Sequence, residues 1–130
     1  MCFYIHTDYP KAIIAEKDIE CYKILRSDSD TDDLYSPFLY KTYFKKTDTH
    51  PKILKEFSLG IHDNEIHEGL HSYSNYSAAD EKRIALLDWY DSAFSVHKCI
   101  IPAGTAYYYN PDHNQYVSKK LKIYKKNIKQ

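Results

Sequence analysis

The apolar pattern is clearest late in the chain, where residues 96–101 form a short run rich in β-branched side chains. Such a run is typical of a strand that is covered on both faces. Pro102 and Gly104 then interrupt it, because proline has no N–H for a neighbouring strand and glycine accepts backbone angles that other residues avoid. The pattern therefore predicts a central strand, a turn over residues 102–105 and a second strand over residues 106–109.

Other segments carry shorter patterns that also predict strands. Residues 19–25 alternate so that Cys21 faces one side and Tyr22 the other, with both faces mostly apolar. Residues 117–123 alternate apolar and polar side chains, which predicts a strand with one covered face, and residues 125–130 are expected to fray. Weaker strand predictions fall on residues 2–5, 39–44 and 70–73, residues 13–15 form a short apolar run, and residues 53–59 form a short element of ambiguous type.

One stretch has the apolar spacing of a helix. Ala79 and Leu86 lie on one face of a helix drawn over residues 77–93. Ser77, followed three residues later by Asp80, resembles an N-terminal capping box. One main helix over residues 77–93, combined with the predicted strands, gives the expected fold class. The whole chain is expected to be a single α+β domain with an antiparallel or mixed sheet of about five to seven strands.

Composition narrows the class of partner. The 130 residues include 18 basic and 18 acidic side chains, so net charge does not draw the chain to nucleic acid or to an anionic membrane. Lysines crowd residues 119–129, but lysines on a terminal strand also protect a sheet edge from pairing, and nucleic-acid binding is not expected. The 14 tyrosines suit half-buried sheet surfaces and leave open a tyrosine-lined binding face.

The cysteines and the lengths of the apolar segments indicate the cellular compartment in which the protein is expected. Cys2, Cys21 and Cys99 are odd in number and widely spaced, which fits neither a disulfide framework nor a CxxC site. No segment approaches the roughly 20 apolar residues of a membrane span, and residues 1–10 lack the features of a signal peptide. We therefore expect a cytoplasmic protein in which Cys21 and Cys99 are small buried residues.

Potential metal ligands are densest over residues 61–71, where His62, His67 and His71 lie beside several carboxylates. Imidazole and carboxylate groups bind zinc and iron. However, Gly69 lies between His67 and His71 and disfavours the continuous helix that an HExxH site requires. We expect a polar surface loop there and assign neither a metal nor another cofactor.

A cysteine nucleophile is also considered and not expected. Cys99 follows His97 by two residues, and on a strand the two side chains would stand about 7 Å apart. That separation is too long for the hydrogen bond that would activate the thiol.

Four blocks of sequence resemble a known group of proteins. The blocks are AEKDIECYKIL, SPF, EGLHSY and KCIIPAGTAYYY with the later YVSKKLKI, over residues 15–25, 36–38, 68–73 and 98–123. In similar order they resemble a group of small uncharacterised proteins of phages and gut-type bacteria. The resemblance covers most of the chain and implies a cytoplasmic single-domain protein without an assigned function.

The block order is also similar to that of the ADP-ribosyltransferase fold. In that fold a first strand supplies a histidine or arginine, a second carries an aromatic residue or serine beside NAD, a helix follows, and a later strand presents a catalytic glutamate. Here Lys23 or Arg26 would replace the first-strand residue, and Gln115 precedes the last strand in place of glutamate. The resemblance implies an inactive NAD-binding relative that uses Tyr22, His71, Ser72 and Tyr73.

The leading expectation is an interaction or binding protein without catalytic activity, and a protein is one kind of partner. Its tyrosine-rich sheet and residues 71–73 are expected to line a pocket. The alternative is the ADP-ribosyltransferase-like NAD binder. A fold-level analogy does not establish function, so the geometry of the site has to decide between these two hypotheses.

Overall fold

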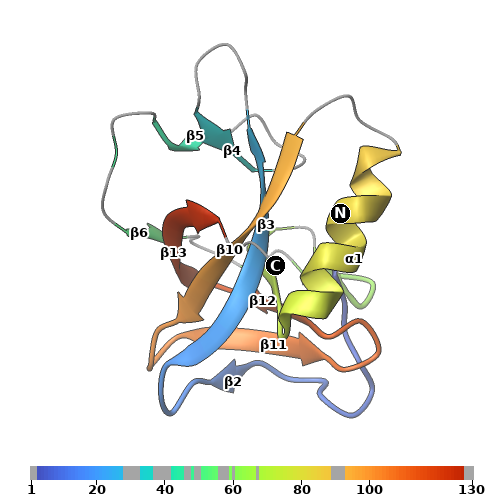
Figure 1. The fold of residues 1–130 in the computed structure, drawn as a ribbon. Helices are drawn as coiled ribbons and strands as arrows, with labels where there is room; N and C mark the ends of the chain where they lie inside the picture. The colour runs from blue at the N-terminus through green and yellow to red at the C-terminus, as the bar shows by residue number, and fades with distance from the viewer. Residues whose placement is uncertain are drawn as a thin grey trace.

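The computed structural model describes residues 3–27, 33–36, 42–45, 48, 51–55, 59, 61–66, 68–88 and 93–127. Within these residues, thirteen strands form two antiparallel sheets, and one helix, α1 (Tyr76–Leu87), packs beside the larger sheet (Figure 1). The larger sheet has ten strands and the smaller has three. The protein is therefore mostly β, and the predicted α+β fold with a sheet of five to seven strands is wrong.

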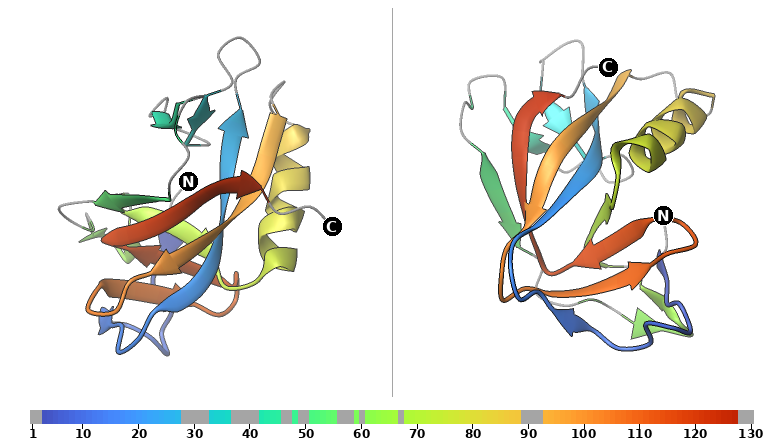
Figure 2. Two further views of the ribbon diagram at one scale, coloured as in Figure 1. Left: turned by 60° about the vertical axis from the view of Figure 1, so that its left-hand side comes forward. Right: turned by 60° about the horizontal axis from the view of Figure 1, so that its bottom comes forward.

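Eight strands of the larger sheet lie side by side in the order β2 (Ile13–Ile14), β11 (Ala106–Asn110), β12 (Gln115–Ser118), β9 (Leu70–Tyr73), β3 (Ile19–Ser27), β10 (Ala93–Ile101), β13 (Lys120–Asn127) and β6 (Lys52–Lys55). The strands β4 (Leu34–Tyr35) and β5 (Thr42–Phe44) extend it beside β3. The smaller sheet has the order β1 (Phe3–Tyr4), β8 (Glu65–Ile66) and β7 (Ile61–His62). Figure 2 shows β11 and β12 running across the direction of β3 and β10, so the larger sheet bends strongly.

Three hydrophobic clusters hold these elements together. The first covers one face of β3 and β10, the second lies between α1 and their other face, and the third lies between the small sheet and β11 and β12. Leu25 and Ile101 belong to the first cluster, Ile24 and Leu86 to the second, and Phe3 and Val117 to the third. The predicted alternation over residues 19–25 is confirmed, because successive residues of β3 belong to opposite clusters.

The predicted central strand is confirmed. β10 pairs with β3 along its whole length and with β13 on its other side. At the end of β10, the N–H of Thr105 donates a 3.1 Å hydrogen bond to the carbonyl oxygen of Pro102, and Gly104 has a φ of 86°. A positive φ at the third position is the mark of a type II turn. Pro102 and Gly104 therefore form the turn that the sequence predicted.

The helix begins earlier and ends earlier than predicted. Its N-cap is Asn75, whose side-chain oxygen accepts a 2.8 Å hydrogen bond from the N–H of Ala78, while Ser77 lies inside the first turn. Ala93, the predicted last helical residue, is the first residue of β10 and pairs with Ser27. The long ladder between β10 and β3 outweighs the helical spacing of the apolar residues near residue 93.

Residues 61–66 form the hairpin β7–β8 rather than the predicted polar loop. Its two turn residues, Asp63 and Asn64, have φ values of 48° and 63°, as a type I′ hairpin turn requires. Ile66 in β8 is fully buried in the third cluster. A strand of two residues is too short to show an alternating pattern, so the many polar residues of this segment favoured a loop in the sequence-based prediction.

The strand predicted over residues 117–123 is two strands. β12 pairs with β11 and β9, whereas β13 pairs with β10 and β6, so the chain passes from one half of the sheet to the other at Lys119. β13 continues to Asn127, past the start of the segment expected to fray, and residues 128–130 lie outside the described residues. The remaining strand predictions correspond to β1, β5 and β9, of which β9 matches residues 70–73, while residues 39–41 lie outside the described residues. The apolar run at residues 13–15 contains β2, and the ambiguous segment 53–59 overlaps β6.

Candidate functional site

A groove of about 480 Å³ lies between one face of α1 and the turn that joins β11 to β12. This volume falls in the range of about 300–1,000 Å³ that is usual for small-molecule sites. The helix lines the groove with residues three or four apart, namely Ala78, Glu81, Lys82 and Ala85. The opposite wall consists of Tyr4, Tyr73, Asp112, His113, Asn114 and Gln115.

Hydrogen bonds between separate segments hold the wall opposite the helix. Asn114 has a φ of 49°, and its carbonyl oxygen accepts a 2.7 Å hydrogen bond from the N–H of Ser74, just before α1. The side-chain amide of Asn110 donates to the carbonyl oxygen of Tyr4 at 2.8 Å, and its oxygen accepts from the N–H of Asp112 at 2.9 Å. The groove is therefore formed by segments that are far apart in sequence and fixed to one another by backbone and amide groups.

The groove is lined by apolar and polar surface together and carries charges of both signs. Glu81 and Asp112 contribute carboxylates, and Lys82 contributes an ammonium group. Asp112 Oδ2 also lies 3.3 Å from His6 Nε2. Burial raises the pKa of Tyr73 to about 12, so its hydroxyl keeps its proton at neutral pH. Such a surface can hydrogen-bond a ligand and balance charged groups on it.

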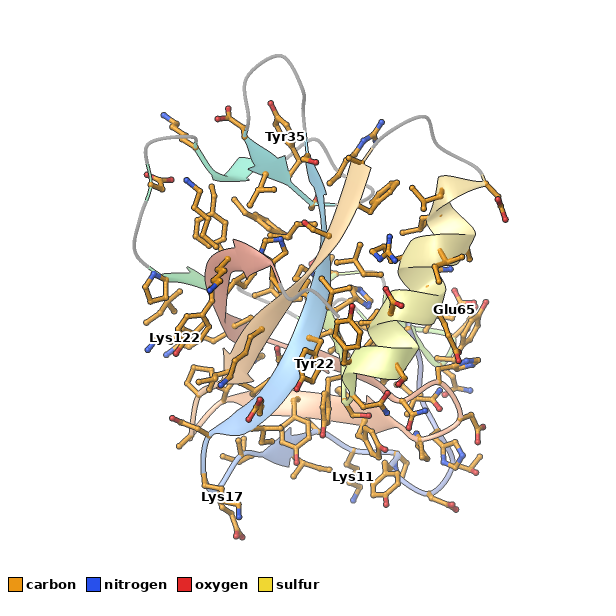
Figure 3. The ribbon with its side chains drawn as sticks, viewed as in Figure 1. Lys11, Lys17, Tyr22, Tyr35, Glu65 and Lys122 are labelled. Carbon is orange, nitrogen blue, oxygen red and sulfur yellow. The ribbon has the colours of Figure 1, made fainter. Side chains whose placement is uncertain are left out.

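Of the four predicted site residues, the structure places Tyr73 in the groove and the other three elsewhere. Tyr22 is the cross-strand partner of Tyr73, but its ring packs edge-on against Tyr76 at 6.2 Å between centroids. Figure 3 shows Tyr22 on the face of β3 beside the first turn of α1. His71 packs near Phe3, with ring centroids 6.5 Å apart, and Ser72 is fully buried beside Cys21.

His71 and Ser72 each contain a buried polar atom without a hydrogen-bond partner among the described residues, His71 Nδ1 and Ser72 Oγ. Burial and the charge of Lys23 lower the pKa of His71 to about 3, so the imidazole is neutral at neutral pH. Successive residues of a strand point to opposite faces, so Ser72 points away from the side of β9 that carries His71 and Tyr73. His71 shares the face of Tyr73 but packs near Phe3 and does not line the groove.

Lys23 is a buried residue that sequence reasoning did not place in the core. It is 6% exposed, its Nζ donates a 2.6 Å hydrogen bond to the carbonyl oxygen of His71, and the same Nζ lies 5.9 Å from the ring centroid of Tyr43. The strands β3 and β9 share one register pair, Tyr22 with Tyr73, and we call this junction the β3–β9 seam. The sequence does contain a sign of this burial, because Lys23 lies between Cys21 and Leu25 on the apolar face of an alternating strand.

Next to the seam lie two free thiols. Cys21 of β3 and Cys99 of β10 are direct cross-strand partners, and both are fully buried. A hydrogen bond from Cys99 lowers the pKa of Cys21 against the effect of burial, with smaller contributions from Ser72 and Lys23. Burial raises the pKa of Cys99 well above its usual value. Two residues that the sequence indicated only as small and buried are thus chemically different from each other.

His97 is held by two hydrogen bonds inside the sheet. One ring nitrogen, Nδ1, lies 2.9 Å from the carbonyl oxygen of Tyr124, and Nε2 lies 2.7 Å from Ser95 Oγ. Since a carbonyl only accepts, Nδ1 carries the proton and Ser95 donates to Nε2. Burial lowers the pKa of His97, which keeps the ring neutral. Cys99 Sγ donates to the backbone oxygen of His97 at 3.4 Å, so the imidazole does not activate this thiol.

Two further expectations concern metals and membranes. In the part of the chain that the structure describes, no group of three or more His, Cys, Asp and Glu side chains could hold a metal ion. The side chains of His62 and His67 lie outside that part, so the cluster with His71 is not covered by this finding. α1 is 12 residues long, and no helix among the described residues is long and apolar enough to cross a membrane.

No protein-family model, curated protein or solved structure matches this chain significantly.

Proposed function

We propose that this protein is a non-catalytic binding protein that holds a small polar ligand in the groove between α1 and the β11–β12 turn. The observation that carries the proposal is the groove itself, with a volume of about 480 Å³ and walls fixed by hydrogen bonds between distant segments. A pre-formed concave site with a few fixed polar groups is the usual form of a small-molecule site.

The walls combine apolar surface with charged groups, which favours a ligand that carries both. Ala78, Ala85 and the tyrosine rings supply apolar surface, whereas Glu81, Lys82 and Asp112 supply charges. A ligand that carries both an anionic and a cationic group would find a partner for each, and Tyr73 and Tyr4 would contact its flat or apolar part. A zwitterionic dipeptide fits this description in charge, whereas a mononucleotide would use only the cationic partner, Lys82.

An NAD-binding protein of the ADP-ribosyltransferase type is the second candidate. One observation favours it, because Tyr73, which that resemblance assigned to NAD, lines the groove. Tyr22, His71 and Ser72 do not line the groove, so a bound NAD would have to use the helix and the turn instead. NAD therefore belongs in the test of the main proposal.

We further propose that the protein acts in the cytoplasm, as the sequence analysis expected. The two buried free thiols support a reducing compartment, because neighbouring cysteines in secreted proteins are usually oxidised.

The test is a thermal-shift screen of the purified protein against dipeptides, mononucleotides and NAD, followed by calorimetric titration of each hit. A ligand at 100 times its dissociation constant stabilises the native state by about 2.7 kcal/mol, which such a screen detects. We expect hits among these compounds. A screen without any shift would contradict the proposal.

A matched pair of helix variants shows whether a hit occupies the groove. Ala85 lines the groove and is exposed, so Ala85→Trp should block it and weaken binding at least tenfold. Ile84 is its neighbour on α1, is 52% exposed and does not line the groove, so Ile84→Trp should leave the affinity unchanged. A hit with equal affinity for both variants would place the ligand elsewhere and contradict the assignment.

A further inference from the structure

Cys21 and Cys99 have the backbone positions of a cross-strand disulfide. They face each other directly in the antiparallel ladder of β3 and β10, and their side chains belong to the same buried cluster. Directly opposed residues in such a ladder have Cα atoms about 4.5–5.5 Å apart. This range lies within the roughly 4.4–6.8 Å between Cα atoms that a disulfide spans.

The surroundings of the pair are polar on one side, which is unusual inside an apolar cluster. Lys23, two residues from Cys21 and on the same face of β3, is 6% exposed, and its positive charge acts on both thiols. Ser72 is fully buried on the neighbouring strand, and its hydroxyl lies beside the Cys21 thiol and lowers its pKa. A cation and a hydroxyl donor beside a thiol both stabilise its thiolate.

We propose that Cys21 and Cys99 form a redox-active dithiol that hydrogen peroxide or a small organic hydroperoxide oxidises to a cross-strand disulfide. Cys21, which lies nearer the polar side, is the attacking thiol, and Cys99 is the resolving thiol. Disulfides in cytoplasmic proteins are commonly transient and sense oxidants, so this site would record exposure to peroxide.

The reaction has two steps. The Cys21 thiolate attacks one peroxide oxygen, the O–O bond breaks, and the leaving hydroxide takes up a proton to give water and a sulfenic acid on Cys21. The Cys99 sulfur then attacks the Cys21 sulfur, the S–S bond forms, and the S–O bond breaks. The leaving hydroxide takes the proton of Cys99 and departs as a second water. Overall, the two thiols lose two electrons and two protons, and the peroxide is reduced.

The β3–β9 seam provides the route for the oxidant. Both thiols are fully buried, so a reagent reaches them only when the sheet opens locally. β3 and β9 are joined at the single register pair Tyr22 with Tyr73, next to Cys21, while β3 and β10 are paired along nine positions. Opening at the seam exposes Cys21 and leaves Cys21 opposite Cys99.

The test uses the Cys2→Ser variant, which removes the third cysteine of the chain. The folded variant is treated with hydrogen peroxide, denatured, alkylated with N-ethylmaleimide and weighed by mass spectrometry. We expect a loss of two hydrogen atoms, no alkylation, and recovery of two alkylated thiols after reduction with dithiothreitol. A treated protein that still alkylates at both cysteines, or that gains oxygen atoms without a bridge, would overturn the proposal.

Two single variants test the order of attack. In the Cys2→Ser background, Cys99→Ser should retain a sulfenic acid on Cys21 that dimedone traps, and Cys21→Ser should leave Cys99 unreacted under the same treatment. Trapping on Cys99 rather than Cys21 would overturn the assigned roles.

Discussion

The Nζ of Lys23 on β3 donates a 2.6 Å hydrogen bond to the carbonyl oxygen of His71 on β9, close to the register pair that Tyr22 and Tyr73 form between the two strands. A buried carbonyl oxygen needs a donor, and here a lysine supplies it. A charged side chain in the core thus links β3 and β9 beside their register pair.

Replacing Lys23 should destabilise the protein in a graded way. Lys23→Met keeps the aliphatic stem and removes the donor, so the free energy of unfolding should fall by about 1.5–3 kcal/mol. Lys23→Ala also leaves a cavity, and the fall should be larger, about 2–5 kcal/mol. Urea denaturation at pH 7 measures both changes.

Lys98 provides the matched control for Lys23. It lies on the neighbouring strand β10, its side chain is 46% exposed, and its Nζ lies 3.6 Å from Glu20 Oε1. Lys98→Met should therefore change stability by less than about 1 kcal/mol. A Lys23→Met variant as stable as Lys98→Met would show that the buried hydrogen bond contributes nothing.

Stability should decrease in acid because of His71. Its pKa is about 3 in the folded state, against about 6.5 for an ordinary histidine, since burial and Lys23 oppose its charge. Below about pH 6.5 the unfolded chain binds a proton that the folded protein does not, so the free energy of unfolding falls as the pH falls towards about 3. Each pH unit in that window corresponds to at most about 1.4 kcal/mol for this group.

His71→Leu should remove this contribution. The variant also eliminates the buried Nδ1 atom that lacks a partner among the described residues, so it should be as stable as the natural protein at pH 7 or slightly more stable. At pH 4.5 it should be the more stable of the two by about 2–3 kcal/mol. His113→Asn, at an exposed position, is the control, and equal pH dependence in all three proteins would refute the prediction.

The observed N-cap and the predicted one can be compared directly. Asn75→Ala removes the side-chain acceptor of the Ala78 N–H and should lower stability by about 1 kcal/mol. Ser77→Ala lies within the first turn and should be neutral within about 0.5 kcal/mol. Thermal denaturation of the two variants should reproduce this order, whereas the reverse order would favour Ser77 as the cap.

Two glycines with a positive φ should respond differently to alanine. Both Gly69, with a φ of 110°, and Gly104, with a φ of 86°, have a conformation that a Cβ disfavours by about 1–2 kcal/mol. At Gly69 the added Cβ would also lie 2.7 Å from Val117 Cγ2 and 3.0 Å from Leu59 Cδ2, whereas at Gly104 it meets no atom within 4 Å.

Gly69→Ala should therefore destabilise the protein by about 1–3 kcal/mol more than Gly104→Ala. Urea denaturation of the two variants at the same pH measures the difference. Equal losses of stability would mean that the core around Val117 can accommodate a methyl group without strain.

Long elements with a clear period were predictable from the sequence. β3 and β10 each have nine residues and alternate between two covered faces, and Pro102 with Gly104 marked the turn after β10. The segment 70–73 was also recognised as a strand. The short strands β4, β7 and β8 have two residues each, and two positions define no period.

The site was less predictable than the strands. Residues 71–73 are expected from the sequence to line a pocket, but among them only Tyr73 lines the groove, since strand alternation turns Ser72 away and His71 packs near Phe3. The residues of α1 and of the β11–β12 turn were missed. No local pattern marks them, because the groove arises from the packing of segments about 30 residues apart.

By itself, the sequence determined the alternating strands β3 and β10, the approximate helix, the turn at Pro102 and the absence of net charge. These depend on interactions between residues close in the chain, which period and composition record. Only the tertiary structure decided which strands pair, that Lys23 bridges the β3–β9 seam, that Cys21 lies opposite Cys99, and that the groove forms beside α1. Those relationships join residues far apart in sequence, and they are fixed by burial and by hydrogen bonds that exist only after the sheet has folded.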